Sequence, residues 1–168
     1  MILIIISIIL LTAIDQLSKW IALSSLKPIG NITIIENWFD LTFVENRGAA
    51  FGILEGQRWF FIIMVLLVTV IAFRFLYKME KRDKAHNWLR FSIVLILSGA
   101  WGNVIDRIFR GYVVDYFEFT FIDYPVFNIA DIYVVVGAIL MSILVLFVIK
   151  DEDEDKEKNI ETKNLEKD

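Results

Sequence analysis

Two aspartates, Asp115 and Asp131, are the side chains of this sequence best suited to hydrolytic chemistry. Two carboxyl groups that share one site do not both ionise easily, so the pKa of one of them rises. The neutral acid can then donate a proton while the charged carboxylate removes a proton from water. Each residue also has a structural alternative: Asp131 opens an apolar run where a helix N-cap is expected, and Asp115 is a candidate surface residue of an aromatic loop. If the fold brings them together, they form a hydrolytic dyad in which either one can be the base.

The sequence offers few residues suited to other classes of catalysis. The chain contains no cysteine, which excludes thiol catalysis, disulfide bonds and cysteine-bound metal. Its single histidine, His86, lies in a basic loop, so neither a Ser-His-Asp triad nor a histidine-rich zinc site is expected. We expect no metal ion and no organic cofactor.

Long apolar runs decide the fold class. Residues 132–149 are 18 residues without a charge, about the minimum length for crossing a bilayer core of roughly 30 Å. Similar runs predict membrane-spanning helices over about 2–23, 59–77, 88–108 and 131–149. The first is interpreted as a retained helix, because no small-residue cleavage site follows it. The sequence therefore predicts an all-α integral membrane protein with one membrane-embedded domain over residues 1–150, followed by a disordered acidic cytoplasmic tail over 151–168.

The loop between the second and third spans fixes the expected orientation, because short loops rich in Lys and Arg stay in the cytoplasm. The basic residues in and beside this loop are Arg74, Lys78, Lys81, Arg82, Lys84 and Arg90. Both termini are then cytoplasmic, and segments 24–57 and 109–130 lie outside. Within the first outer segment, β-branched and aromatic residues at 32–35 and 41–44 flank a turn region at 36–40, which predicts a small extracytoplasmic β-sheet.

By this topology, the polar residues of the spans gather near the outer face. A charge inside the hydrocarbon costs about 2.5–3.5 kcal/mol at the centre of a helix, so such residues are candidates for function. Asp15 and Lys19 are four apart on one helical face, which predicts an ion pair. This pair is either a structural salt bridge at the helix end or a functional one that braces the site or contacts a lipid phosphate through Lys19. Asn103 shares a face with Asp106 and Arg107, and that last pair is predicted to be structural electrostatics. Small residues at 46–52 allow close backbone approach or a simple turn.

Five sequence blocks follow one another in this order: DQLSK at 15–19, NRGAAFG at 46–52, GAWGNVIDR at 99–107, VVDY at 113–116 and FNIAD at 127–131. By these blocks the chain resembles bacterial lipoprotein signal peptidase, also called signal peptidase II, over nearly its whole length apart from the acidic tail. It departs from the family pattern at Ser98, where glycine is common, and at Tyr116, where phenylalanine is common.

The resemblance implies a membrane aspartic endopeptidase that removes the signal peptide from diacylglyceryl-modified prolipoproteins and cuts just before the lipidated cysteine. It implies that Asp115 and Asp131 are the catalytic dyad. Supporting polar positions are implied at Asp15, Lys19, Asn46, Asn103, Arg107 and Asn128, and small or apolar motif positions at Gly48, Ala49, Phe51, Gly99 and Ala130. The implied fold is four transmembrane helices with a small outer β-sheet and an extended outer loop.

The implied partners are the lipidated prolipoprotein, membrane phospholipid and globomycin-type peptide inhibitors, with no nucleic acid. The implied place is the bacterial cytoplasmic membrane, with the site near the outer leaflet. Substrate is expected to arrive laterally from the bilayer, and small residues near Gly48 and Gly99 are expected to make room for it.

Two other functions also use intramembrane polar residues or membrane helices and are compared with the sequence. A small proton- or ion-coupled transporter also uses intramembrane carboxylates, but it predicts polar residues through the full membrane depth. Here the fourth span holds only Ser142 after Asp131, and the second holds only Thr69 before Arg74. A non-catalytic membrane assembly subunit would leave Asp115 and Asp131 replaceable.

Overall fold

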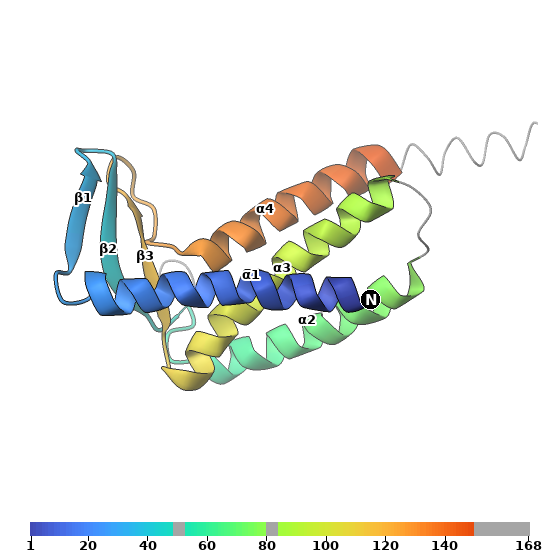
Figure 1. Cartoon of the computed structure of the whole chain (residues 1–168), viewed down its shortest axis with the longest axis horizontal. Helices are drawn as coiled ribbons and strands as arrows, with labels where there is room; N and C mark the ends of the chain where they lie inside the picture. The colour runs from blue at the N-terminus through green and yellow to red at the C-terminus, as the bar shows by residue number, and fades with distance from the viewer. Residues whose placement is uncertain (49–52, 80–83, 150–168) are drawn as a thin grey trace, which may run out of the picture.

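The computed structural model describes residues 1–48, 53–79 and 84–149. Its helices include four that are long and apolar enough to cross a membrane: Ile2–Leu26, Arg58–Lys78, His86–Phe109 and Ile129–Phe147. A small sheet stands at one end of the helices, and the amino terminus lies at the other end (Figure 1). This architecture confirms the predicted fold class. The predicted acidic tail at 151–168 lies outside the described residues.

The helices follow the predicted spans with shifted ends. The first membrane helix consists of α1 and a π-helical continuation and ends at Leu26, three residues beyond the prediction. The last begins at Ile129, two residues before its predicted start. The observed elements are α1 (Ile2–Ile21, continued over Ala22–Leu26), α2 (Arg58–Lys78), α3 (Lys84–Phe109) and α4 (Ile129–Ile143, continued over Leu144–Ile149).

Asn128 caps α4, and Asp131 completes the cap from within the first helical turn. The Asn128 side chain accepts a hydrogen bond from the backbone N–H of Asp131 at 3.0 Å. Asp131 Oδ2 in turn accepts one from the backbone N–H of Asn128 at 3.1 Å. This reciprocal capping box satisfies two N–H groups that a helix start leaves without partners. The alternative that Asp131 is the N-cap residue is therefore wrong. The Oδ1 atom of Asp131 takes no part in the cap and is available for another contact.

Three antiparallel strands form the sheet, in the order β1 (Asn31–Ile35), β2 (Phe39–Asn46) and β3 (Val113–Phe119). The predicted strands lie within β1 and β2, and the turn between them is shorter than predicted because β2 already begins at Phe39. In the β2–β3 ladder, Val44 lies opposite Asp115 and Asn46 lies opposite Val113. The sheet thus brings the end of β2 beside the strand that carries Asp115.

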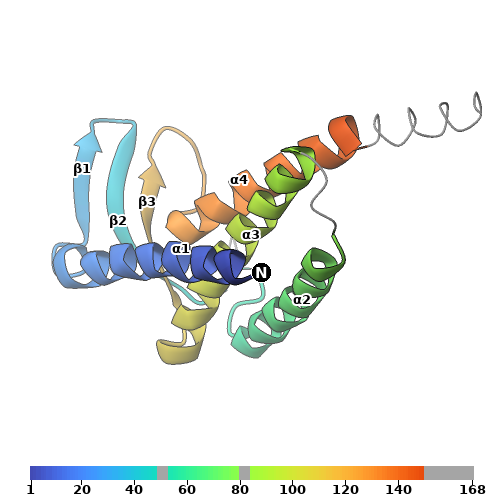
Figure 2. The same ribbon diagram turned by 45° about the vertical axis from the view of Figure 1, so that its right-hand side comes forward.

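Helix α3 lies between the other helices and contacts each of them (Figure 2). Glycines allow α4 to approach it closely. A Cβ added to Gly99 would meet the carbonyl oxygen of Ala130 and come within 2.8 Å of Val134 Cγ2, and one added to Gly137 would lie 2.8 Å from the carbonyl oxygen of Ser92. Gly99 itself therefore leaves no room for substrate, because the backbone of α4 fills that space.

Replacing Gly99 with alanine is expected to push α3 and α4 apart. Overpacking a tight interface costs about 1–3 kcal/mol, so we expect Gly99→Ala to lower the thermal stability of the detergent-solubilised protein. The midpoint Tm of unfolding measures this. Ala138→Val adds volume on the exposed face of α4 and is the matched control, with a native Tm. Equal Tm values for the two variants would contradict this close packing.

Candidate active site

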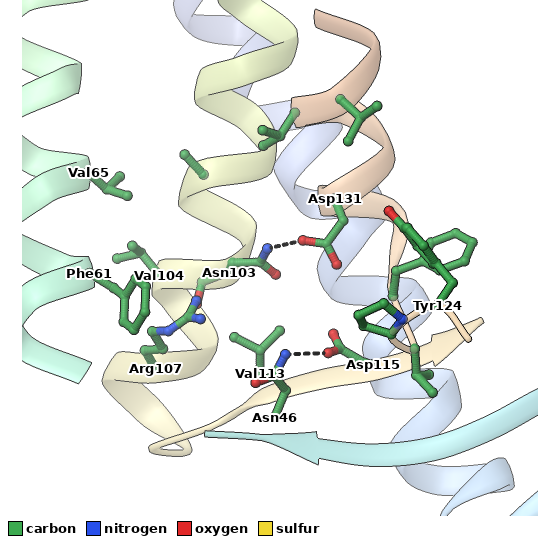
Figure 3. A pocket seen from close by; sticks show the side chains of 16 residues that line it. Asn46, Phe61, Val65, Asn103, Val104, Arg107, Val113, Asp115, Tyr124 and Asp131 are labelled. Atoms are coloured by element: carbon green, nitrogen blue, oxygen red, sulfur yellow. Dashed lines mark hydrogen bonds between the residues drawn. The ribbon is translucent and has the colours of Figure 1, made fainter. Parts of the chain in front are cut away.

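A cavity of ≈ 380 Å³ opens where the helices meet the sheet, and both Asp115 and Asp131 line it. Figure 3 shows the two carboxylates reaching into it from different elements, Asp115 from β3 and Asp131 from the start of α4. The fold therefore brings together the two residues that the sequence singled out. The remaining lining residues are Asn46, Phe61, Val65, Ala100, Asn103, Val104, Arg107, Val113, Tyr124, Pro125, Val126, Phe127, Val134 and Val135.

Asp115 is almost fully buried, with 1% of its surface exposed. Its Oδ2 accepts a hydrogen bond from Asn46 Nδ2 at 2.9 Å, and its Oδ1 accepts one from Asn128 Nδ2 at 2.6 Å. Burial above all, and the Asp131 carboxylate second, raise the pKa of Asp115 to about 7, although the two amide donors and Lys19 act in the opposite direction. Asp115 can therefore hold a proton near neutral pH.

Asp131 is only partly buried, so its carboxylate is open to the cavity. Its Oδ1 accepts a hydrogen bond from Asn103 Nδ2 at 2.7 Å, while Oδ2 completes the helix cap. Asn128 Nδ2 also donates to Asn103 Oδ1 at 3.2 Å. A chain of amide groups thus connects Asp115 through Asn128 and Asn103 to Asp131. Because these bridges are neutral, they orient both carboxylates without adding charge to the site.

Beneath this bridge lies a buried ion cluster around Lys19, Asp15 and Asp106, whose side chains are all 0% exposed. Lys19 Nζ lies 2.9 Å from Asp15 Oδ2, 3.2 Å from Asp106 Oδ2 and 2.8 Å from Asn103 Oδ1. The predicted ion pair of Asp15 with Lys19 is present. Contact of Lys19 with a lipid phosphate does not fit this geometry, because its ammonium is enclosed by three oxygens of the protein.

The cluster also reaches α4 through a backbone contact. Asp15 Oδ1 accepts a hydrogen bond from the backbone N–H of Ala130 at 3.0 Å. Ala130 is completely buried and lies between the cap residue Asn128 and Asp131.

Among the described residues, no three His, Cys, Asp or Glu side chains group together as a metal site would require.

Arg107 holds the turn that follows β2. Its Nη2 donates to the carbonyl oxygen of Gly48 at 2.7 Å, and its guanidinium lies 4.3 Å from the centre of the Phe61 ring. The backbone N–H of Gly48 donates to Asn46 Oδ1 at 2.9 Å, which leaves the Nδ2 of Asn46 directed at Asp115. A chain of hydrogen bonds thus links Arg107 to Asp115 through Gly48 and Asn46. Ala49 and Phe51, also singled out in the sequence, lie outside the described residues.

Sequence reasoning missed the true partners of Asp106. It paired Asp106 with Arg107, whereas the carboxylate contacts Lys19 and Arg110, and Gln16 Nε2 donates to it at 3.2 Å. The spacing of Asp106 and Arg110, four residues on one helix, was a signal that could have identified one of these contacts. The contacts with Gln16 and Lys19 cross between helices, and no local spacing reveals them.

Four membrane-spanning helices that end in a cavity with two carboxylates define the class: a multi-pass membrane protein with a candidate hydrolytic site. A family model described as Signal peptidase (SPase) II matches residues 7–147. The chain belongs to this family of bacterial membrane proteins and is therefore a peptidase.

Individual relatives support the same family membership. The chain is 54% identical over 140 residues to the lipoprotein signal peptidase of Clostridioides difficile strain 630, covering 83% of this chain and 92% of that protein. It is 42% identical over 134 residues to the protein of the same name from Caldanaerobacter subterraneus subsp. tengcongensis, covering 80% and 89%. A solved structure described as a bacterial membrane enzyme is 33% identical, with a TM-score of 0.75, and covers 85% of this chain and 87% of that one.

The raised pKa of Asp115 has a consequence for stability. Because the folded chain holds this proton more tightly than the unfolded chain, the free energy of unfolding falls as the pH rises from about 4 to about 7. The loss is at most about 4 kcal/mol. We expect Asp115→Asn to remove most of this dependence, which a series of Tm measurements from about pH 4 to about pH 8 will show. The control Asp123→Asn changes an exposed loop aspartate and keeps the native slope; parallel curves for all three proteins would contradict the burial of a protonated Asp115.

Proposed function

We propose that this chain is an aspartic endopeptidase that removes the signal peptide from diacylglyceryl-modified prolipoproteins, cutting just before the lipidated cysteine. Its membership of the signal peptidase II family supports the substrate class. The observation that carries the aspartic mechanism is the pair Asp115 and Asp131, which line one cavity and are joined by two asparagine side chains.

In the proposed mechanism, Asp115 carries the shared proton and Asp131 is the base. The oxygen of a water molecule attacks the scissile carbonyl carbon while Asp131 takes a proton from that water. At the same time, Asp115 donates its proton to the carbonyl oxygen. The tetrahedral intermediate then collapses: the C–N bond breaks, Asp131 gives its proton to the leaving amine, and Asp115 regains its own from the intermediate's hydroxyl. The burial of Asp115 and the more open position of Asp131 support this division of roles.

We assign supporting roles to the residues that hold this pair. Asn46, Asn103 and Asn128 donate hydrogen bonds to the two carboxylates. The other supporting residues act one contact further out, and they are Asp15 and Lys19 in the ion cluster, Arg107 and Gly48 at the turn, and Ala130 through its backbone. None of these contacts requires a metal ion or an organic cofactor.

The cavity lining suits a substrate that carries lipid. Its membrane side is apolar, with Phe61 and Val65 from α2 facing Val134 and Val135 from α4. All four lie within the membrane-spanning segments, so acyl chains can enter between α2 and α4 from the bilayer. We expect globomycin-type cyclic peptides to compete for this cavity, membrane phospholipid to surround it, and no nucleic acid to bind.

The proposed orientation puts both termini in the cytoplasm and the cavity near the outer leaflet of the bacterial cytoplasmic membrane. The amino terminus and the end of α4 lie at the end of the molecule opposite the sheet (Figure 1). The basic residues Arg74 and Lys78 lie at that same opposite end, in the last turns of α2, as the retention of Lys and Arg on the cytoplasmic side requires.

The mechanism is tested by removing one carboxylate at a time. We expect Asp115→Asn and Asp131→Asn each to reduce kcat by about 10²–10⁴-fold, because each removes one proton-transfer group. The assay is cleavage of a diacylglyceryl-modified prolipoprotein by the purified protein in detergent, with the unlipidated precursor in parallel. Asp123→Asn is the matched control and retains native activity. Native cleavage by either dyad variant would refute the mechanism, and a native chain that cleaves neither precursor would favour a transporter or an assembly subunit.

The pH dependence gives a second test. Activity is expected to fall above about pH 7, because Asp115 then loses the proton that it donates. Asn46 stabilises the charged form of Asp115, so Asn46→Ala is expected to raise that pKa and move the basic limb of the pH–rate profile upward by about one unit. Asn31→Ala, at an exposed position in β1, is the control and leaves the profile in place. A downward shift for Asn46→Ala would contradict the assignment of Asp115 as the acid.

A further inference from the structure

One buried carboxylate, that of Asp106, touches supports of both members of the dyad without touching the cavity. It lies near the end of α3 and is 0% exposed. Its Oδ2 accepts a hydrogen bond from the backbone N–H of Val114 at 3.1 Å and lies 3.2 Å from Lys19 Nζ. Its Oδ1 pairs with Arg110.

The contact with Val114 fixes the strand that carries Asp115. Val114 directly precedes Asp115 in β3 and is completely buried. Without Asp106, the Val114 N–H would be a buried donor with no partner, which costs about 1–3 kcal/mol and favours movement of the strand. The chain reverses direction between α3 and β3 through Gly111, whose φ of 81 lies in the left-handed region. The carboxylate thus spans this reversal and sets the position of β3 relative to α3.

The contact with Lys19 reaches the other aspartate. Asn103 Oδ1 faces two donors, Lys19 Nζ and the side chain of Asn128, so its amide has one orientation that satisfies its neighbours. In that orientation Asn103 Nδ2 donates to Asp131. By holding the Lys19 ammonium in place, the Asp106 carboxylate therefore acts on the hydrogen bond that orients Asp131.

We propose that Asp106 is a positioning residue that sets the separation of Asp115 and Asp131, through the Val114 backbone on one side and the Lys19–Asn103 contact on the other. This role rests on the dyad mechanism proposed above. Arg110 distinguishes this role from a role in stability alone. It is bound to the same carboxylate, yet it contacts neither Val114 nor Asn103 in the described structure. If Asp106 served stability only, the loss of Asp106 and the loss of Arg110 would have the same effect on catalysis.

Kinetics of matched variants separate the two roles. A displacement of about 1 Å between reacting groups costs about 10²-fold in rate, so we expect Asp106→Ala to lower kcat by about 10²-fold with KM nearly unchanged. Asp106→Asn keeps an oxygen that can accept from Val114 and is expected to recover about 10-fold of that loss. The control Arg110→Met is expected to lower Tm and leave kcat near the native value. Native kcat in Asp106→Ala, or an equal loss of kcat in Arg110→Met, would overturn the proposal.

A backbone variant keeps the test decisive if Asp106→Ala does not fold. Replacing Val114 with its α-hydroxy acid exchanges the donating N–H for an ester oxygen and leaves every side chain of the ion cluster in place. We expect this ester variant to lose about 10-fold in kcat, the equivalent of one hydrogen bond. If it retains native kcat while Asp115→Asn and Asp131→Asn are inactive, the positioning role of Asp106 fails and the dyad mechanism stands. If the dyad variants are active, the proposed function itself fails.

Discussion

The enclosed ammonium of Lys19 is the contact on which the rest of the site depends. It lies within hydrogen-bonding distance of Asp15, Asp106 and Asn103, in the part of the chain that crosses the membrane. Removing one member of a buried ion pair costs about 3–5 kcal/mol, because the remaining charge has no water to solvate it. The cluster therefore joins α1 to α3 firmly, and Asp15 extends the connection to the backbone of α4 at Ala130.

The two carboxylates of the dyad come from different kinds of element and different surroundings. Asp115 belongs to a strand and is almost sealed from solvent, whereas Asp131 belongs to the first turn of a helix and opens into the cavity. The asparagines between them supply donors without charge. A cationic bridge in their place would lower the pKa of Asp115 and weaken its hold on the proton.

The membrane helices, the sheet and the convergence of polar residues could be predicted from the sequence, because each leaves a local pattern. Hydrophobic runs mark the spans, and polar residues at the same depth mark a shared site. A small residue such as Gly99 signals either open space or close backbone approach, and only its packing against Ala130 shows that close approach applies there. Sequence reasoning placed the cap at Asp131 as the structural alternative, although the pairing of Asn128 with an acid three positions on is typical of a capping box. The contacts of Asp106 depend on tertiary approach alone.

The order of the two dyad aspartates along the chain bears on biosynthesis. Asp115 precedes α4, and Asp131 arrives only with that helix, which is the last of the four to be translated. A nascent chain whose final helix has not entered the bilayer holds one carboxylate without its counterpart, and its strand lacks the Asn128 donor as well. Under the proposed mechanism, a chain whose fourth helix has not yet been inserted therefore cannot hydrolyse a peptide bond, so activity begins only when insertion is complete.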